Sequence, residues 1–314
     1  MAQKPPQSTQ KAAEPAYNRR DFIEGPPGRI LRILAEYMEP QQRFRRERVH
    51  DIVVFFGSAR IVSRETAEWE LQEAQRNLKR TQTKQARAAL EAAKHKVKMS
   101  RYYEEARELA KRLTEWSMAL RESRARFVIC SGGGPGIMEA ANRGASEAGG
   151  RTVGLGITLP NEQLPNGYIT ESLNFQFHYF FMRKYWFAYL GKALVVFPGG
   201  FGTLDELFEI LTLIQTGKIV KKMLVLLYGR QYWERVLNLQ TLVEEGMINA
   251  EDLDLFEYAD TPEEAFEKVK GGLEKYYLQS PAKLKDTAPV ADSLAADPPA
   301  MDNAVTDAPD SGNL

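Results

Sequence analysis

Short apolar runs alternate with amphipathic segments along most of this 314-residue chain. The first run is "DIVVFF" (Asp51–Phe56), which is rich in β-branched residues and stops at Gly57. Similar runs follow as "RFVIC", "RTVGLGI", "LNFQF", "ALVVF", "KMLVLLY" and "LFEYAD". Segments with helical spacing separate most of them, a pattern typical of a parallel sheet covered on both faces. The sequence therefore predicts an α/β fold with a doubly wound parallel sheet.

Two flanking segments and one insertion depart from this alternation. Residues 1–28 are rich in proline, glutamine and charge, and residues 278–314 hold few large apolar side chains, so both are predicted to be disordered. Residues 29–277 are then a single domain. Within it, residues 62–100 lack glycine and proline and carry charge on most faces. This inserted segment is predicted to be one long helix or a hairpin bent near "TQTK", acting as a solvated spacer or a self-association arm.

Charge and composition exclude several classes of function. With 42 basic and 42 acidic side chains, the chain has no global field to attract nucleic acid or an anionic membrane. A single cysteine, Cys130, and three scattered histidines argue against a metal centre. The first residues lack the apolar core of a signal peptide, and no run is long enough to span a bilayer. We therefore expect a cytoplasmic protein without metal, cofactor, nucleic-acid or membrane partners.

Three glycine-rich loops follow predicted strands, and their candidate ligand-binding residues are Gly57 and Ser58; Gly132, Gly133 and Gly134; and Gly199, Gly200, Gly202 and Thr203. In open parallel sheets, ligands bind at the carboxyl ends of strands, where backbone N–H groups at a helix start can hold an anion. Thr203 is predicted to cap the helix after the third loop. The loops therefore predict a phosphate-bearing ligand.

Two common nucleotide-binding motifs do not match these loops. The G-x-G-x-x-G dinucleotide fingerprint fails, because the frame from Gly132 ends on Ile137, and no P-loop motif is present.

Two cations, Arg183 and Lys184, lie within the strongly apolar run "FFMRKYWF". They could snorkel or pair with a carboxylate. Alternatively, Arg183 could lie over a ligand held by the third loop, beside Glu206. Asp205 is expected only to complement the dipole at the start of that helix.

These motifs together resemble the Lonely Guy (LOG) family of Rossmann-like proteins, which are often labelled lysine decarboxylases. The resemblance rests on "GGGPGIMEAANRGA", on the pair Arg183 and Lys184, and on P-G-G-x-G-T-x-x-E from Pro198 to Glu206. It covers residues 52–60 and 102–277. Shorter members commonly carry Met-His-x before the Arg-Lys pair, where this chain has Phe-Phe-Met.

The resemblance implies a nucleoside 5′-monophosphate phosphoribohydrolase, an N-glycosidase-type hydrolase that converts AMP or an N6-modified AMP (a cytokinin nucleotide) to free base and ribose 5-phosphate. Arg183 and Glu206 would be catalytic, and Lys184 would bind substrate together with the glycine loops. Glu206 would stabilise positive charge on the ribose, and Arg183 negative charge on the departing base. The resemblance also implies a homodimer or higher homo-oligomer, with sites at the subunit interface.

Two other functions stay open. The same fold also serves non-catalytic nucleotide or molybdenum-cofactor carriers, because a fold does not fix a function. The charged insertion could instead make the protein an assembly partner.

Overall fold

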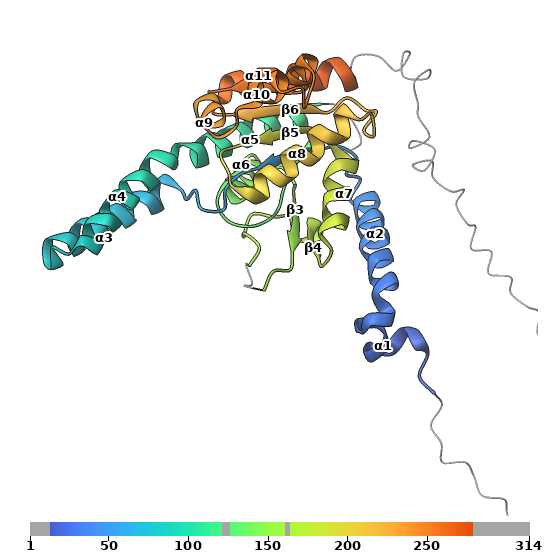
Figure 1. Cartoon of the computed structure of the whole chain (residues 1–314). Helices are drawn as coiled ribbons and strands as arrows, with labels where there is room; N and C mark the ends of the chain where they lie inside the picture. The colour runs from blue at the N-terminus through green and yellow to red at the C-terminus, as the bar shows by residue number, and fades with distance from the viewer. Residues whose placement is uncertain (1–12, 121–125, 161–163, 279–314) are drawn as a thin grey trace, which may run out of the picture.

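The computed structural model describes residues 13–120, 126–160 and 164–278 (Figure 1). Within these ranges seven strands form one sheet in the order β4-β3-β2-β1-β5-β6-β7, and every neighbouring pair is parallel. The strands are β1 (Ile52–Phe56), β2 (Val128–Ser131), β3 (Thr152–Ile157), β4 (Asn174–Phe177), β5 (Gly191–Val196), β6 (Leu224–Tyr228) and β7 (Glu257–Ala259). The predicted parallel α/β sheet is confirmed.

Helices cover both faces of the sheet (Figure 1). They are α1 (Arg20–Glu24), α2 (Arg29–Arg46), α3 (Arg64–Thr81), α4 (Lys84–Met99), α5 (Arg101–Ala119), α6 (Ile137–Glu147), α7 (Phe180–Leu190), α8 (Phe201–Gln215), α9 (Arg230–Val236), α10 (Leu239–Glu244) and α11 (Pro262–Leu273). One buried cluster joins the sheet to α2, α7, α8 and α9, and a second joins it to α5, α6 and α11. Among the described helices, none combines the length and apolarity that crossing a membrane requires.

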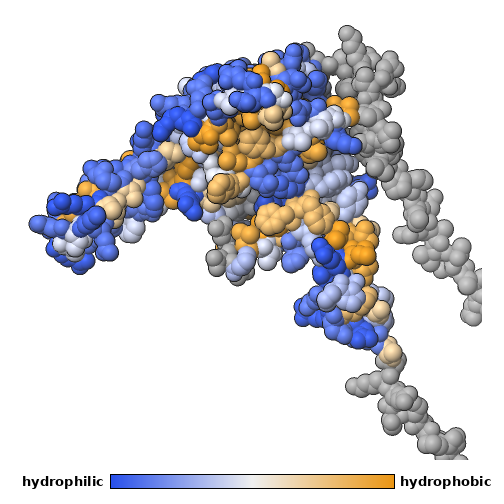
Figure 2. Space-filling view, viewed as in Figure 1, coloured by the Kyte–Doolittle hydropathy of each residue, from blue (hydrophilic) through white to orange (hydrophobic). Residues whose placement is uncertain are grey.

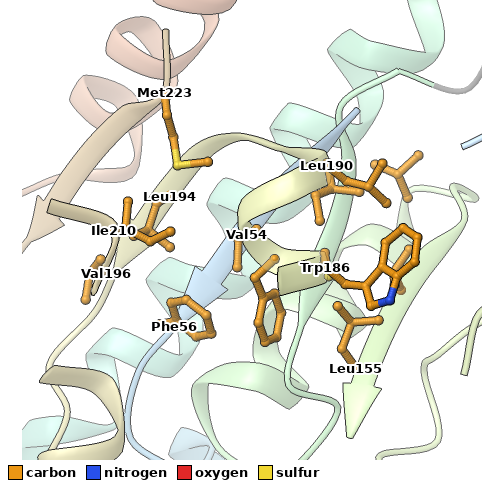
Figure 3. Close-up of a cluster of buried hydrophobic side chains, with 14 of the residues drawn as sticks. Val54, Phe56, Leu155, Trp186, Leu190, Leu194, Val196, Ile210 and Met223 are labelled. Atoms are coloured by element: carbon orange, nitrogen blue, oxygen red, sulfur yellow. The ribbon is translucent and has the colours of Figure 1, made fainter. Parts of the chain in front are cut away.

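Strand β1 shows why the apolar runs are continuous. Its side chains point alternately to the two faces, so Val54 and Phe56 pack in the first cluster and Val53 and Phe55 in the second. Because helices cover both faces, every position of the strand is buried. Figure 3 shows the first cluster, in which Trp186 of α7 packs beside Val54 and Leu155.

The strand order reverses between β1 and β5, since β2 to β4 lie on one side of β1 and β6 and β7 beyond β5. In open parallel sheets a crevice for ligands forms at the carboxyl ends of the strands at this reversal. The two strands stay paired beyond their ends, because the N–H of Phe197 donates to the carbonyl of Phe56 at 2.8 Å. The loops after β1 and β5 therefore start side by side.

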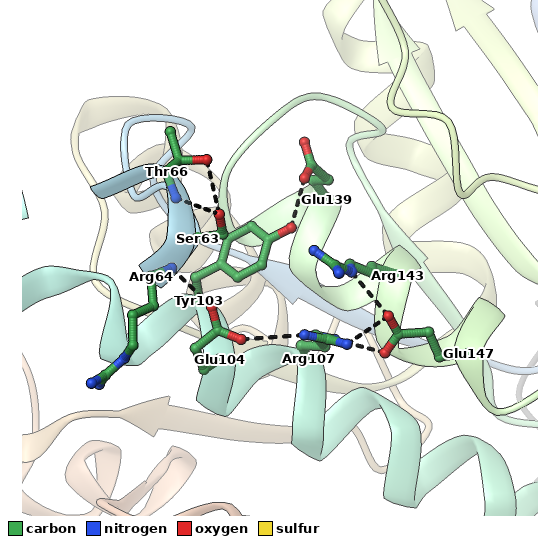
Figure 4. A network of polar contacts seen from close by, with 9 residues as sticks. All are labelled: Ser63, Arg64, Thr66, Tyr103, Glu104, Arg107, Glu139, Arg143 and Glu147. Carbon is green, nitrogen blue, oxygen red and sulfur yellow. Dashed lines mark hydrogen bonds and ion pairs between the residues drawn. The ribbon is translucent and has the colours of Figure 1, made fainter. Parts of the chain in front are cut away.

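The inserted segment is a hairpin, one of the two predicted forms. Helices α3 and α4 lie side by side and project from the body of the protein (Figure 1). Gln82 takes a left-handed conformation at the turn (φ 52°), and the Thr83 hydroxyl caps α4 by accepting from the N–H of Ala86. Glu104 and Arg107 lie in a network at the base of the hairpin that ties α3 and α5 to α6 (Figure 4). The spacer and self-association roles stay predictions.

Part of the predicted disordered arm is helical. Residues 13–28 contain the short helix Ala16–Asn18, α1 and the helical turn Pro26–Gly28. The Arg32 guanidinium holds this segment to α2 by donating to the carbonyl of Gly25 at 2.8 Å. Residues 1–12 and the predicted tail after Leu278 lie outside the described residues.

The helical spacing of "QYWERVLNLQTLVEEG" predicts a single helix after the run "KMLVLLY", but the structure has two helices there, α9 and α10. The break occurs because the Asn238 side chain accepts from the N–H of Thr241 and starts a new helix. This correction does not affect the order of strands.

Two glycines inside helices should respond oppositely to alanine. A Cβ on Gly144 of α6 would lie 2.0 Å from the carbonyl oxygen of Arg107 in α5, whereas one on Gly271 of α11 would meet nothing within 4 Å. We expect Gly144→Ala to destabilise the fold by about 1–3 kcal/mol through overpacking. Gly271→Ala should stabilise it by about 0.5–1 kcal/mol through helix propensity. Urea unfolding measures both, and equal effects of the two substitutions would contradict this account of the α5–α6 contact.

Candidate functional site

The three glycine loops meet at the carboxyl edge of the sheet. The N–H of Ser58, after β1, donates to the carbonyl of Pro198, after β5, at 3.0 Å. The carbonyl of Ser58 accepts from the N–H of Ile137, at the start of α6, at 3.2 Å. A side chain on Gly136 is excluded, because its φ is +74° and a Cβ would lie 2.4 Å from the carbonyl oxygen of Ser58. The structure thus brings the predicted loops together.

Several of the predicted binding glycines have a packing reason of their own. A Cβ on Gly57 would lie 2.7 Å from the side chain of Ile137, and one on Gly132 would lie 2.8 Å from that of Met138. Gly133 is buried beside Ile169, which a Cβ would approach to 3.1 Å. Gly57 and Gly132 therefore let α6 approach the sheet closely, and Gly133 makes room for Ile169, whatever ligand binds.

A buried asparagine, which the sequence analysis missed, braces the second loop. Asn142 of α6 accepts from the Ser131 hydroxyl at 2.6 Å and from the Asn166 amide at 3.0 Å. That same Asn166 amide donates to the carbonyls of Gly133 and Gly134 at 3.0 Å each. The sequence pattern could have indicated this role, because Asn142 is the polar residue on the apolar face of "IMEAANRGA".

The third loop differs from the other two, because two of its glycines border open space. A Cβ would meet nothing within 4 Å on Gly200 or Gly202, whereas on Gly199 it would lie 2.1 Å from the Thr203 hydroxyl. The Tyr232 hydroxyl also fixes this loop by donating to the carbonyl of Gly199 at 2.7 Å. Gly200 and Gly202 are exposed, and among the described residues the first N–H groups of α8 have no partner within the helix and no side-chain cap.

The predicted capping role of Thr203 is wrong. Helix α8 begins at Phe201 and its N-cap is Gly200, which has no side chain with which to cap the helix. Thr203 lies in the first turn, is buried, and donates its N–H to the carbonyl of Gly200 at 3.0 Å. Its hydroxyl lies under Gly199 rather than at the helix tip.

Arg183 of α7 and Glu206 of α8 form a buried ion pair beside this loop. Nη2 of Arg183 lies 3.1 Å from Oε1 of Glu206, and the two side chains are 14% and 5% exposed. The guanidinium also lies against the rings of Phe180 and Phe187, 5.2 and 5.8 Å from their centroids. Within the described residues, its Nε is buried and has no hydrogen-bond partner. One donor of the pair is thus removed from water without a compensating hydrogen bond, which is an unfavourable arrangement.

Burial controls the ionisation of this pair. Desolvation raises the pKa of Glu206 to about 7, although the positive charges of Arg183 and Lys184 lower it. Desolvation likewise lowers the pKa of Arg183 from its ordinary value, against the attraction of Glu206. The site thus holds a carboxyl group that changes its protonation state near neutral pH.

Lys184 is held by two carboxylates. Its Nζ lies 2.8 Å from both Asp205 and Glu209 of α8. Burial would lower the pKa of Lys184, but the hydrogen bonds to these carboxylates outweigh it and the pKa is raised. Asp205 therefore pairs with a lysine, which corrects its predicted role as a dipole charge alone. The prediction that Lys184 binds substrate stays untested.

Two open cavities lie on other parts of the described structure. One of about 600 Å³ is lined by α3, α5 and α6 and includes Trp69 and Arg143. The other, of about 480 Å³, lies between α9, α10 and β7. Arg143 in the first cavity already pairs with Glu147, as Figure 4 shows. We place the candidate site at the sheet edge instead, because the glycine loops and the buried ion pair meet there.

Comparison with known proteins points to the same elements. The family model described as "Possible lysine decarboxylase" matches residues 138–269, which run from α6 through α11. A cytokinin riboside 5'-monophosphate phosphoribohydrolase of Rhodococcoides fascians is 33% identical over 134 residues, 41% of this chain and 65% of that protein. One of Arabidopsis thaliana is 28% identical over 149 residues, 46% of this chain and 66% of that protein.

Over these residues the chain is similar to proteins of the LOG family. The matched part spans only 58% of the length of another LOG relative, a probable cytokinin riboside 5'-monophosphate phosphoribohydrolase of Oryza sativa, to which it is 28% identical. Helices α1 to α5 lie outside the part that the family model matches. The matched part therefore includes the third glycine loop and the ion pair, whereas the first two glycine loops precede it.

Solved structures with a similar arrangement include a molybdenum cofactor binding protein from Rippkaea orientalis, 20% identical, with a TM-score of 0.38 over 54% of this chain and 86% of that one. Another is the molybdenum cofactor carrier protein of Chlamydomonas reinhardtii, 22% identical, with a TM-score of 0.38 over 55% of this chain and 88% of that one.

The two cations of α7 should contribute unequally to the ionisation of Glu206. We expect Arg183→Met to raise the pKa of Glu206 further above about 7, because Arg183 is the stronger of the two groups that lower it. Lys184→Met should raise it less. Carbon-13 NMR of carboxyl-labelled glutamate measures both, with the resonance assigned by its loss in Glu206→Gln. A Glu206 that titrates in the ordinary glutamate range would contradict the buried pair.

Proposed function

We propose that the protein is a nucleoside 5′-monophosphate phosphoribohydrolase, which hydrolyses the N-glycosidic bond of AMP or an N6-modified AMP. The observation that carries the proposal is the buried pair of Arg183 and Glu206 beside the open glycines of the third loop. The family and the names of its relatives support this activity. The geometry of the site offers a group for binding the phosphate and a group for stabilising each charge that develops during cleavage.

The 5′-phosphate would bind at the start of α8. Gly200 and Gly202 leave the backbone N–H groups accessible, and the positive end of the helix dipole favours an anion there. Thr203 would contribute mainly by shaping the loop, because its hydroxyl lies under Gly199. Phosphate binding at this point directs the ribose toward Glu206, one turn further along the helix.

Cleavage of the glycosidic bond builds positive charge on the ribose and negative charge on the base. Ionised Glu206 would stabilise the first charge and orient the attacking water. Arg183 would stabilise the second, since its guanidinium stays charged. Both groups are largely removed from water, which strengthens these interactions.

The description of the family as lysine decarboxylases fits this site less well. Amino-acid decarboxylation commonly uses a lysine that forms a Schiff base with a bound cofactor, and such a lysine needs a lowered pKa. At the candidate site, Lys184 is held by Asp205 and Glu209, and its pKa is raised. Its proton is therefore held more tightly than that chemistry allows.

A carrier of nucleotides or molybdenum cofactor is the alternative function. A carrier needs the phosphate-binding loops but gains nothing from a carboxylate that is buried at an unfavourable cost. The raised pKa of Glu206 reflects this unfavourable burial of the ionised carboxylate. Such a shift is typical of a catalytic group rather than of a structural one. We therefore favour the enzyme.

Chromatography of the protein incubated with AMP, isopentenyladenosine monophosphate and the matching nucleosides tests the activity. We expect release of free base from the monophosphates and none from the nucleosides, because the phosphate anchors the ribose. If no monophosphate releases base while calorimetry still detects nucleotide binding, the carrier function replaces the enzyme.

Removal of the carboxylate should abolish most turnover. We expect Glu206→Gln to lower kcat by about 10²–10³-fold, the range found when one preorganised electrostatic group is removed, while nucleotide binding persists. In the wild-type protein, kcat/KM should rise with pH through about 7, because only the ionised carboxyl stabilises the ribose cation. Steady-state rates from pH 5 to 9 measure this. Full activity in Glu206→Gln would refute the assigned roles.

We also propose that a second copy of the chain covers the aromatic rim of the site. Phe180 and Phe181 of α7 are 49% and 52% exposed, and Phe201 of α8 is 93% exposed. Figure 2 shows apolar side chains on this side of the molecule and along α2, where Leu34 and Met38 are exposed. Such a surface is typical of a contact between subunits.

Light scattering of the wild-type protein should give the mass of a dimer or a larger homo-oligomer. Phe181→Glu should lower that mass, because a charge would be buried in the contact. A matched variant lacks the α3–α4 hairpin, with a short glycine linker in its place, and should keep the wild-type mass. If the hairpin deletion alone gives monomers, the hairpin is the self-association arm.

A further inference from the structure

A carboxylate from α2 caps the helix that carries Arg183. Oε1 of Glu36 accepts from the N–H of His178 at 2.7 Å, and Oε2 accepts from the N–H of Tyr179 at 3.2 Å. Tyr179 is the N-cap of α7 and supplies no capping side chain itself. N–H groups at the start of a helix need an acceptor and favour negative charge, so Glu36 satisfies both needs from another element.

The same residue also holds the middle of α7. The backbone carbonyl of Glu36 accepts from the indole N–H of Trp186 at 3.0 Å. The ring of Tyr37, the next residue, lies 5.6 Å from that of Tyr185 and 5.9 Å from that of Trp186. Glu36 thus contacts α7 at two points that are two turns apart.

Other contacts of α2 converge on the strand that leads into α7. Phe44 stacks on Phe175 of β4 at 4.6 Å between centroids, and Arg43 donates to the carbonyl of Asn174 at 2.7 Å. Figure 1 shows α2 lying against α7 at the edge of the sheet. Helix α2 precedes the residues that match the family model, so this support comes from a part of the chain outside that match.

Arg183 depends directly on the capped turn. Its N–H donates to the carbonyl of Tyr179 at 3.2 Å, so it lies one turn after the residue that Glu36 caps. On its other side, the guanidinium reaches Glu206 at 3.1 Å. A shift of the first turn of α7 therefore changes this distance.

We propose that Glu36 is a positioning residue, which caps α7 and thereby fixes Arg183 against Glu206. The effect on turnover rests on the proposed function, whereas the effect on Glu206 does not. The charged groups that face Glu206 are Arg183 and Lys184 of α7 and Asp205 and Glu209 of α8, and none of them is changed when Glu36 is replaced.

The sign of the change in Glu206 distinguishes positioning from a direct charge effect. Removing the negative charge of Glu36 would, through space alone, lower the pKa of Glu206, because a nearby negative charge disfavours its ionisation. Displacing Arg183 would raise that pKa, because Arg183 favours the ionised carboxyl. If Glu36 positions Arg183, its removal should therefore raise the pKa of Glu206. If Glu36 acts only through its charge, its removal should lower that pKa.

The experiment compares Glu36→Ala and Glu36→Gln with Glu39→Gln, which removes a carboxylate from the same helix that pairs with Arg43. Carbon-13 NMR gives the pKa of Glu206, and base release gives kcat and KM. We expect Glu36→Ala to raise the pKa and to lower kcat about five- to tenfold, with a smaller change in KM. Glu36→Gln should be intermediate, because its amide oxygen keeps one acceptor. Glu39→Gln should match the wild type.

An unchanged or lowered pKa of Glu206 in folded Glu36→Ala would overturn the proposal. If Glu36→Ala does not fold, the same criterion applies to Glu36→Gln. If the wild-type protein releases no base, the proposed function fails, but the NMR measurement still decides whether Glu36 positions Arg183.

Discussion

The pairing of β1 with β5 at the reversal of strand order is the constraint on which the rest of the site depends. Its ladder continues past the strands, through Phe197 to Phe56 and through Ser58 to Pro198. The turn after β1 is thereby fixed to the turn after β5, and the carbonyl of Ser58 fixes the start of α6 as well. Three loops from distant parts of the sequence are thus held by backbone bonds. Such bonds require a close approach of the backbones, which is why glycine is needed at Gly57 and Gly136.

Neighbouring residues on α7 and α8 show how burial and charge compete. Arg183 and Lys184 are both 14% exposed in their side chains, yet the pKa of Arg183 is lowered and that of Lys184 is raised. The difference lies in the guanidinium of Arg183, which is more deeply buried than the ammonium of Lys184, and in their partners. Glu206 is 5% exposed and shares the dry environment of Arg183, so desolvation outweighs attraction for both. Asp205 and Glu209 are 58% and 35% exposed, and water still stabilises their charges when they pair with Lys184.

Strand positions and strand type could be predicted from the sequence because helices cover both faces, which requires continuous apolar runs such as Asp51–Phe56. The pairing of Arg183 with a carboxylate could also be predicted, because a cation buried in an apolar helix needs a negatively charged partner. The start of α8 could not be predicted correctly. A threonine at the end of a glycine run is a typical N-cap, but in the structure Gly200 occupies the N-cap position. The partner of the α7 N-terminus lies 142 positions earlier in the chain, and no local pattern encodes such a contact.

The elements outside the family match attach to opposite faces of the sheet. The α3–α4 hairpin is tied to α5 and α6, which pack in the cluster away from the ion pair. Helix α2 packs with α7 and α8, in the cluster that supports the pair. Phe181, two residues before Arg183, is 52% exposed, and its apolar side chain offers α7 no polar contact. Polar support for α7 comes from Glu36 instead, at the two N–H groups of the capped turn and at Trp186. Helix α2 thus holds the helix that carries Arg183, whereas within the described residues the hairpin makes no contact of this kind with the ion pair. If Arg183 has the proposed catalytic role, changes in α2 should affect turnover more than changes in the length of the hairpin.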